Sequence, residues 1–349
     1  LLTQPPGPSA MTKGATAPSD RSLPPAPPGM ILPGEGIIDA PALRGAILSD
    51  LAQAEDPRAA RGIAVRHLAD AKARGNAALA AAFAARPHDA RALIRAQAHL
   101  TDVLVATAFD IARRHFHPLS NPTEAERMAV LAVGGFGRAE MAPHSDVDLL
   151  FLTPWKITPW AESVIESMLY MLWDLRLKVG HASRTVKDCL RLGREDITIR
   201  TALLEHRFIA GYEPLATELG DRLWGDLFRN TGPEFIEAKL AERAERHKRQ
   251  GGQRYVLEPN VKEGKGGLRD LQTLYWIGKY LHRVPSAEGL VGAGLLSREE
   301  FDSFAQAEDF LWAVRCHLHY ITGRATDTLT FDLQVEVAAR MGYRDTAGR

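Results

Sequence analysis

The segment that decides the fold is Gly134-Gly-Phe-Gly-Arg-Ala-Glu-Met-Ala-Pro-His-Ser-Asp-Val-Asp-Leu-Leu-Phe151, which joins two short apolar runs. The first run, residues 128–133, is β-prone and is followed by two glycines, as a buried strand is where it meets a tight turn. The second run, residues 147–152, has the composition of another strand. The segment therefore predicts two strands joined by a glycine-rich turn.

Two aspartates stand at the start of the second predicted strand. Side chains alternate along a strand, so Asp146 and Asp148 point to the same face, about 6.6 Å apart along the backbone, while Val147 points into the core. Two like charges at this separation repel unless a cation lies between them. Mg²⁺ prefers oxygen ligands and is commonly held by one or two carboxylates together with substrate phosphates. The pair therefore predicts a magnesium site that receives a metal-bound nucleotide.

The turn before these acids has the residues of a phosphate-binding site. Gly134 and Gly135 carry no Cβ, so the backbone can approach a phosphate closely and present N–H groups to it. Ser145 adds a hydroxyl donor. A dinucleotide fingerprint needs a third glycine where Glu140 stands, and no Gly-Lys-Ser/Thr follows for a P-loop. Glycine and aspartate are also common in ordinary turns, but the two flanking strands favour a catalytic site.

The patterns on either side predict an α+β fold. Apolar residues recur at helical spacing in residues 158–176, and a third strand is expected near 177–186. Residues 36–118 are rich in Ala, Leu and Arg and predict helices, as does the chain beyond about 195. We expect a small mixed sheet with helices packed around it and a largely helical C-terminal region.

Composition divides the chain into four segments. Residues 1–35 are rich in proline and have almost nothing to bury, so they predict a disordered arm. A helical region at 36–118 precedes the sheet core at 119–212, and residues 213–349 form a helical domain. A glycine-rich basic loop at 258–270 interrupts this domain, because its glycines and charges are too dense for a helix interior.

Composition also excludes several classes of protein. Lys plus Arg and Asp plus Glu both total 43, so there is no excess of positive charge to hold a nucleic acid, and we expect no nucleic-acid partner. No apolar run has the length of a membrane span, so no membrane partner is expected. Cys189 and Cys316 are the only cysteines, which indicates a reducing cytoplasm rather than a disulfide framework. Because the chain begins with Leu1 rather than methionine, we expect a fragment of a longer protein.

Four ordered motifs carry a resemblance to a known family. They are Gly134-Gly-Phe-Gly-Arg-Ala-Glu140, Gly180-His-Ala-Ser-Arg-Thr185, Thr201-Ala-Leu-Leu-Glu-His-Arg207 and Asn260-Val-Lys-Glu-Gly-Lys-Gly-Gly-Leu-Arg-Asp-Leu-Gln272. The two glycines followed by Ser145-Asp-Val-Asp148 resemble the signature of the polymerase-β-type nucleotidyltransferase superfamily. Together the motifs resemble the bacterial PII uridylyltransferases, and they cover most of residues 128–343.

That family attaches UMP from UTP to a tyrosine of the PII signalling protein, in nitrogen regulation, and releases pyrophosphate. The resemblance implies that Asp146 and Asp148 bind Mg²⁺ on the triphosphate of UTP during in-line displacement. The family removes the UMP group through a separate HD domain, which is followed by ACT domains. The one His-Asp pair of this chain, His88-Asp89, lies in an alanine-rich helical stretch, so removal is not predicted for these residues.

The superfamily often supplies a third carboxylate, and the expected third strand contains none at residues 179–185. Glu205 is the candidate for this catalytic role, with Asp196 behind it. His181 and Arg184 are candidates for lining the nucleotide site, although a histidine near a strand is more often structural.

Basic residues near the motifs are candidates for phosphate binding. Arg138 is expected to meet phosphate and Glu140 to orient it, and an ordinary surface ion pair explains the two residues equally well. Lys262, Lys265 and Arg269 belong to the glycine-rich loop, which we expect to fold over the triphosphate with its glycines as hinges. The alternative is a mobile solvated loop.

Other functions stay open at this point. An adenylyltransferase acting on another nitrogen-metabolism protein is one, because related enzymes carry a similar Gly-Gly-Leu-Arg-Asp-like segment. A catalytically silent module that binds a nucleotide or a partner is another, because the third carboxylate is not located. An RNA-directed nucleotidyltransferase conflicts with the balanced charge.

Overall fold

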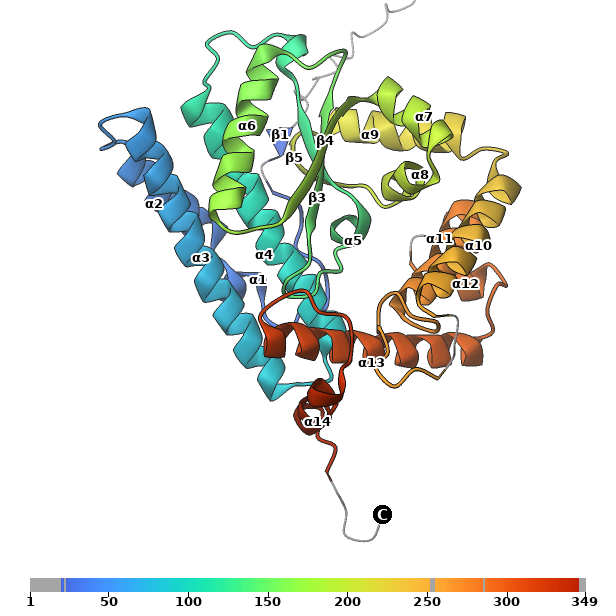
Figure 1. Ribbon diagram of the computed structural model, residues 1–349. Coiled ribbons are helices and arrows are strands. Elements are labelled where there is room, and N and C mark those ends of the chain that lie inside the picture. Colours follow the sequence, from blue (N-terminus) through green and yellow to red (C-terminus); the bar gives the residue numbers. More distant parts are fainter. Residues whose placement is uncertain (1–19, 22, 252–254, 285, 345–349) are drawn as a thin grey trace, which may run out of the picture.

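The computed structural model describes residues 20–21, 23–251, 255–284 and 286–344 of the chain. A mixed sheet lies at the centre, with helices against both of its faces and a helical C-terminal region beside it (Figure 1). The predicted α+β fold is therefore confirmed. Within the described ranges, no helix is long and apolar enough to cross a membrane.

The sheet has five strands within the described residues, in the order β1-β5-β2-β3-β4. Only β3 and β4 run parallel, and every other neighbouring pair is antiparallel. The strands are β1 (Asp20–Arg21), β2 (Ala129–Ala132), β3 (Val147–Thr153), β4 (Val179–Thr185) and β5 (Arg207–Tyr212). The strands β2, β3 and β4 lie where the sequence predicts them, and the turn between β2 and β3 contains α5 (Gly134–Gly137).

Helix α6 (Pro159–Asp174) connects the two parallel strands. Thr158 begins it, because its hydroxyl accepts a hydrogen bond from the backbone amide of Ala161. The connection returns β4 alongside β3, and the register pairs Asp148 with Gly180.

The two faces of the sheet pack against different helices. The residues of β3 that face one core are Val147, Leu149 and Phe151. That core is shared with α4 (Ala90–Ile111) and α6. Leu150 and Leu152 face a second core, formed with α7 (Val186–Glu195), α8 (Ile197–Leu204) and α9 (Glu213–Arg222). Because side chains alternate along a strand, Asp148 points to the same face as Leu150 and Leu152, which is the face that packs against α8.

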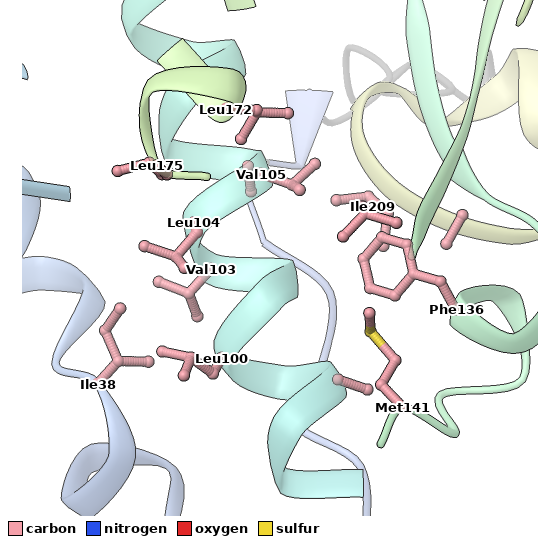
Figure 2. Close-up of a cluster of buried hydrophobic side chains, with 14 of the residues drawn as sticks. Ile38, Leu100, Val103, Leu104, Val105, Phe136, Met141, Leu172, Leu175 and Ile209 are labelled. Atoms are coloured by element: carbon pink, nitrogen blue, oxygen red, sulfur yellow. The ribbon is translucent and has the colours of Figure 1, made fainter. Parts of the chain in front are cut away.

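Helix α4 runs through the first core and is buried on nearly every side. Figure 2 shows its residues Leu100, Val103, Leu104 and Val105 between Ile38 on one side and Phe136, Met141 and Ile209 on the other. Because Phe136 belongs to α5, this core fixes the position of the glycine turn.

A buried ion pair adds to this anchoring. Asp102 of α4 is fully buried and accepts two hydrogen bonds from Arg207 of β5, at 2.8 and 2.9 Å. Arg207 also donates to the carbonyl oxygens of Phe136 and Gly137. Since a buried charge is tolerated only when it is paired, the pair holds α4, β5 and α5 in one arrangement.

The N-terminal helices α1 (Gly34–Ile37), α2 (Ala40–Leu51) and α3 (Pro57–Ala85) pack beside α4. Ahead of them, Ile31 is buried and its amide donates to the carbonyl of Ala92. This part of the chain differs from the predicted disordered arm, because the apolar run Met30-Ile31-Leu32 packs against the core. Residues 1–19 and 22 lie outside the described residues.

The C-terminal region is helical, as predicted. Its long helix α13 (Arg298–Thr322) begins with a capping box between Ser297 and Glu300 and ends at Gly323, which has a φ of 65°. It packs against α4 and α11, which places this region beside the sheet core. The other α-helices are α10 (Gly232–Arg249), α11 (Leu268–His282), α12 (Gly289–Gly292) and α14 (Phe331–Arg340). Elsewhere in the described chain there are two short π-helices, η1 (Ala112–Phe116) and η3 (Leu223–Leu227), and one 3-10 helix, η2 (Glu124–Glu126).

Two features differ from the expected pattern of helices beyond residue 195. The strand β5 was not predicted, because its apolar run Phe208-Ile209-Ala210 is short and follows a helix directly. The loop predicted at 258–270 ends at Gly267, since α11 begins at Leu268 and includes Arg269 and Asp270.

Candidate active site

Asp146 and Asp148 line the same cavity, of about 150 Å³, beside the start of β3. We call it the acidic cavity. Both side chains are open to it, while Val147 between them is fully buried. Enclosure by the cavity and the charge of Asp146 raise the pKa of Asp148, and the charge of Lys262 opposes this rise. Two carboxylates that share a site show this behaviour, and their hard oxygen atoms suit a divalent cation.

The turn before β3 lies against these acids. Gly134 has a left-handed backbone with φ 59°, and a Cβ there would lie 3.4 Å from Asp148 Oδ2. At Gly137 a Cβ would lie 1.8 Å from the carbonyl oxygen of Glu205. Glycine is therefore required at Gly137 by close packing and favoured at Gly134 by conformation. Because α5 begins here, its first N–H groups have no partner within the helix.

Arg138 follows this turn and is held by two carboxylates. Its Nε donates to Glu140 at 2.8 Å and its Nη1 donates to Glu205 at 2.9 Å. Burial by itself would lower the pKa of Arg138, but the charges and hydrogen bonds of both glutamates raise it above its ordinary value. The result is a fixed positive charge that lines both the acidic cavity and a larger neighbouring one.

Glu205 does not have the geometry expected of a third metal ligand. It is 2% exposed, and its other oxygen accepts a hydrogen bond from Lys279 Nζ at 3.4 Å. Asp196, the other candidate, caps the start of α8 through two backbone amides. In the part of the chain that the structure describes, no three acidic, histidine or cysteine side chains are grouped to hold a metal. Glu205 instead orients Arg138.

The larger cavity, of about 510 Å³, lies on the α8 side of the acidic pair. We call it the large cavity. Gly134, Gly135 and Asp148 belong to its lining, so it is continuous with the turn and with the metal-binding candidates. Its opposite wall comes from α10 and α11, whose basic residues in the lining are Lys239, Arg246, Arg249 and Arg269.

One aromatic ring organises the cations of the large cavity. Trp276 of α11 has Lys239 Nζ at 4.4 Å from its ring centre, and the guanidinium carbons of Arg269 and Arg138 at 5.4 and 5.8 Å. Lys239 is 2% exposed and donates to Glu242 at 2.6 Å, and burial lowers its pKa. The arrangement concentrates positive charge beside the glycine turn.

The three basic candidates of the predicted loop have different positions. Lys262 lines the acidic cavity, with its Nζ 3.9 Å from Asp327 Oδ2. Arg269 lines both cavities and pairs with Glu263 at 3.1 Å. Lys265 is exposed and lines neither cavity. The structure thus brings Lys262 and Arg269, but not Lys265, to the site.

The glycines of this segment pack closely rather than serving as free hinges. A Cβ on Gly264 would lie 2.5 Å from the carbonyl oxygen of Asn260, and one on Gly267 would lie 2.8 Å from that of Val261. The amide of Gly264 donates to this Asn260 carbonyl, and the Asn260 side chain accepts from two further amides. The segment is therefore a folded wall of the site.

Two further candidates lie elsewhere. His181 lines a separate hollow beside α6, together with Trp173 and Tyr170. Arg184 is not part of the lining of either the acidic or the large cavity. Ser145, in contrast, lines the acidic cavity as expected from its place beside Asp146.

The sequence did not single out several charged residues that shape the site. Lys239 and Arg246 come from α10, and Arg315 comes from α13. Arg315 donates to Asp327 at 2.8 Å across the acidic cavity. In the sequence, each of these residues is a charged residue within a helical pattern, as Arg315 is between Val314 and Cys316. Such a pattern does not indicate which cavity the residue lines.

A scan of family models matches residues 234–349 to the family described as GlnD PII-uridylyltransferase. Curated relatives match more of the chain. A bifunctional uridylyltransferase/uridylyl-removing enzyme of Cereibacter sphaeroides is 76% identical over 323 residues, which are 92% of this chain and 35% of that protein. Enzymes with the same name from Ruegeria pomeroyi and Rhodospirillum rubrum are 63% and 49% identical, over 90% and 88% of this chain. The chain spans about a third of the length of the curated relatives it matches.

Proposed function

Since this chain is homologous to one part of the bifunctional uridylyltransferase/uridylyl-removing enzymes, we propose that it transfers UMP from UTP to a tyrosine of a PII signalling protein and releases pyrophosphate. The names of the relatives indicate the reaction, and the description of the family indicates the PII acceptor. The observation that carries the proposal is the acidic cavity, in which Asp146 and Asp148 lie beside a glycine turn and open toward a large cavity rich in cations.

Asp146 and Asp148 would hold Mg²⁺, because their two carboxylates share a cavity and the pKa of Asp148 is raised in part by the neighbouring charge. The ion, when bound, supplies positive charge that stabilises the triphosphate and the departing pyrophosphate. Glu205 is not part of this proposed ligand set, because its oxygens are engaged by Arg138 and Lys279.

The chain's own residues bind and orient the nucleotide. Gly134 and Gly135 let the backbone approach phosphate oxygens, and Ser145 offers a hydroxyl at the edge of the acidic cavity. Arg138 would neutralise phosphate charge from a fixed position, since Glu140 and Glu205 already determine the direction of its guanidinium. Fixed charges of this kind need little reorganisation during the reaction.

Lys262 and Arg269 also line the acidic cavity. We propose that they bind the outer phosphates, and that the large cavity holds the rest of the nucleotide. An acceptor tyrosine, whose ordinary pKa is about 10, is protonated at neutral pH. Its hydroxyl would transfer its proton to solvent water during the attack, beside Asp146, which lines the acidic cavity but not the large one.

The proposal covers transfer and not removal of UMP. The relatives' names include a uridylyl-removing activity, but Asp89 of the His88-Asp89 pair is engaged in a helix start, where it pairs with Arg86 at 3.2 Å. The two cysteines are buried and free, which supports a cytoplasmic enzyme. The balanced net charge supports a protein acceptor rather than a nucleic acid.

The donor and the acceptor can be tested together. The protein is incubated with PII, Mg²⁺ and either α-labelled UTP or α-labelled ATP, and label on PII is measured. We expect label from UTP, and none on a PII variant whose acceptor tyrosine is replaced by phenylalanine. Label from ATP alone would favour an adenylyltransferase, and label from neither nucleotide would contradict the proposed function.

A further inference from the structure

A third cavity, of about 240 Å³, lies next to the acidic cavity and has an unusual charge. Among the described residues, its lining contains the basic residues Lys72, Arg176, Lys178 and Arg324 and no aspartate or glutamate. We call it the basic hollow. The whole chain has equal numbers of acidic and basic residues, and the acidic and large cavities both mix the two signs. The basic hollow therefore concentrates positive charge in a way that the rest of the site does not.

The cations of the basic hollow have no acidic partner among the described residues. Lys72 is half-buried, and its ammonium donates only to the carbonyl oxygen of Leu175, at 3.0 Å, among the described residues. Arg176, Lys178 and Arg324 are exposed, and none of them forms an ion pair within the part of the chain that the structure describes. Positive charges gathered without counter-charges repel one another, so their juxtaposition favours an anionic ligand.

The basic hollow and the large cavity adjoin the acidic cavity through different residues. Ser145 and Ala325 line both the basic hollow and the acidic cavity, and Asp146 directly follows Ser145. Asp148 and Gly135, in contrast, line both the acidic cavity and the large cavity. The two carboxylates thus lie between a large cation-rich cavity and a smaller basic one.

In-line displacement requires the acceptor oxygen to approach the α-phosphorus from the side opposite the leaving pyrophosphate. With the outer phosphates at Lys262 and Arg269 and the rest of the nucleotide in the large cavity, the part of the acidic cavity left for the acceptor is the side of Ser145. On the basis of the proposed function, we propose that the basic hollow binds an acidic segment of the PII protein next to the tyrosine that is modified. The carboxylates of that segment pair with Lys178, Arg176 and Arg324 and hold the tyrosine hydroxyl near Asp146.

The lining favours an acidic peptide over a single-stranded RNA. It contains no Phe, Tyr or Trp on which bases would stack, and stacking is a main source of affinity for single strands. Three of its cations are on exposed side chains at the rim, where they match the dispersed carboxylates of a protein surface.

A double charge reversal tests this inference. Lys178→Glu is combined with Arg324→Glu, and the matched control combines Arg58→Glu with Lys187→Glu, whose parent residues are exposed and line none of the three cavities. The KM for PII, the KM for UTP, UTP binding and the thermal unfolding midpoint are measured for each protein. We expect the double variant to raise the KM for PII by about tenfold to hundredfold, with the KM for UTP and the unfolding midpoint unchanged. The control pair should change none of them.

Two further measurements test whether the change in the KM for PII comes from charge attraction to acidic residues of PII. Raising the ionic strength should raise the KM for PII of the wild type more than that of the double variant. A PII variant in which lysines replace the acidic side chains flanking the tyrosine should restore part of the lost affinity in the double variant.

The contradicting results are distinct. A wild type that labels PII, with a KM for PII unchanged in the double variant, overturns the basic hollow as the acceptor site and leaves the proposed function intact. Binding of a single-stranded RNA oligonucleotide that is lost in the double variant, with an unchanged KM for PII, assigns the hollow to RNA and also overturns the inference. A wild type that labels no PII overturns the proposed function and this inference with it.

Discussion

Gly180 lies directly opposite Asp148 in the parallel pair of strands β3 and β4, where a side chain would displace the carboxylate of Asp148. A Cβ on Gly180 would lie 2.6 Å from Asp148 Oδ1. On the other side, a Cβ on Gly134 would lie 3.4 Å from Asp148 Oδ2. The carboxylate of Asp148 therefore lies between two glycines, and the neighbouring strand has glycine rather than an acid at this register position.

Gly180→Ala is expected to displace the carboxylate of Asp148 and lower kcat for UMP transfer between about tenfold and hundredfold, since small misplacements of a catalytic group are costly. The fold should persist, because Gly180 is exposed rather than buried in the core. Gly62→Ala is the matched control, because open space surrounds Gly62 in α3. Equal kcat values for wild type and Gly180→Ala would contradict this role.

Glu205→Gln is expected to remove the charge that fixes Arg138 and to lower the free energy of unfolding by about 3 kcal/mol, because it leaves a buried guanidinium short of a counter-charge. Chemical denaturation measures this loss. A metal-ligand role for Glu205 predicts the reverse pattern, with unchanged stability in metal-free buffer and weaker Mg²⁺ binding. Glu195→Gln, in an exposed pair with Arg191, should change neither quantity measurably.

Asp327 lines the acidic cavity and pairs with Arg315 of α13, so its protonation at low pH should destabilise the protein. Burial alone would raise its pKa, but His319, Arg315 and Lys262 hold it below its ordinary value. Because the pKa is lower in the folded protein than in the unfolded chain, the stability it supplies is complete above about pH 4 and is lost as the pH falls further.

Denaturation at pH 7, 5, 4 and 3 should therefore show a steeper loss of unfolding free energy for the wild type than for Asp327→Asn below pH 4. Above pH 5 the two curves should run parallel, with the variant less stable because Arg315 loses its partner. Parallel curves down to pH 3 would show that the pKa of Asp327 is not lowered in the folded protein.

Gly264→Ala distinguishes a packed wall from a hinge. A Cβ would lie 2.5 Å from a backbone oxygen that cannot move freely, so we expect the variant to lose about 1–3 kcal/mol of unfolding free energy. A hinge would instead leave stability unchanged and lower kcat. Denaturation and steady-state kinetics on the same preparation separate these outcomes.

Much of the fold follows from local pattern. The strands β2, β3 and β4 and the helix α6 were predictable because apolar runs, a glycine turn and the Thr158 cap mark them within short stretches. The strand β5 was not, because it is short and its place in the sheet depends on pairing with β2, far earlier in the chain. Arg207 of this strand also binds Asp102, a residue 105 positions earlier. No local signal in the sequence joins these two residues.

In the site, too, local features were predictable from the sequence and contacts between distant residues were not. The shared direction of Asp146 and Asp148 follows from the alternation of side chains in a strand, which needs only three neighbouring residues. The pairing of Arg138 with Glu205 crosses 67 positions, so the sequence pointed to Glu205 but not to what it binds. Lys265 was grouped with Lys262 by proximity in sequence, whereas the fold of the segment turns it away from both cavities.

The most direct test of the central claim is UMP transfer to PII from α-labelled UTP, with Mg²⁺, by the wild type and by Asp146→Asn and Asp148→Asn. The asparagines keep the size of the side chains and remove the charge that would hold the metal. We expect label on PII with the wild type and a loss of at least about a hundredfold in each variant, with unfolding midpoints close to that of the wild type. Transfer at the wild-type rate by either folded variant would contradict the assignment of the acidic cavity as the catalytic centre.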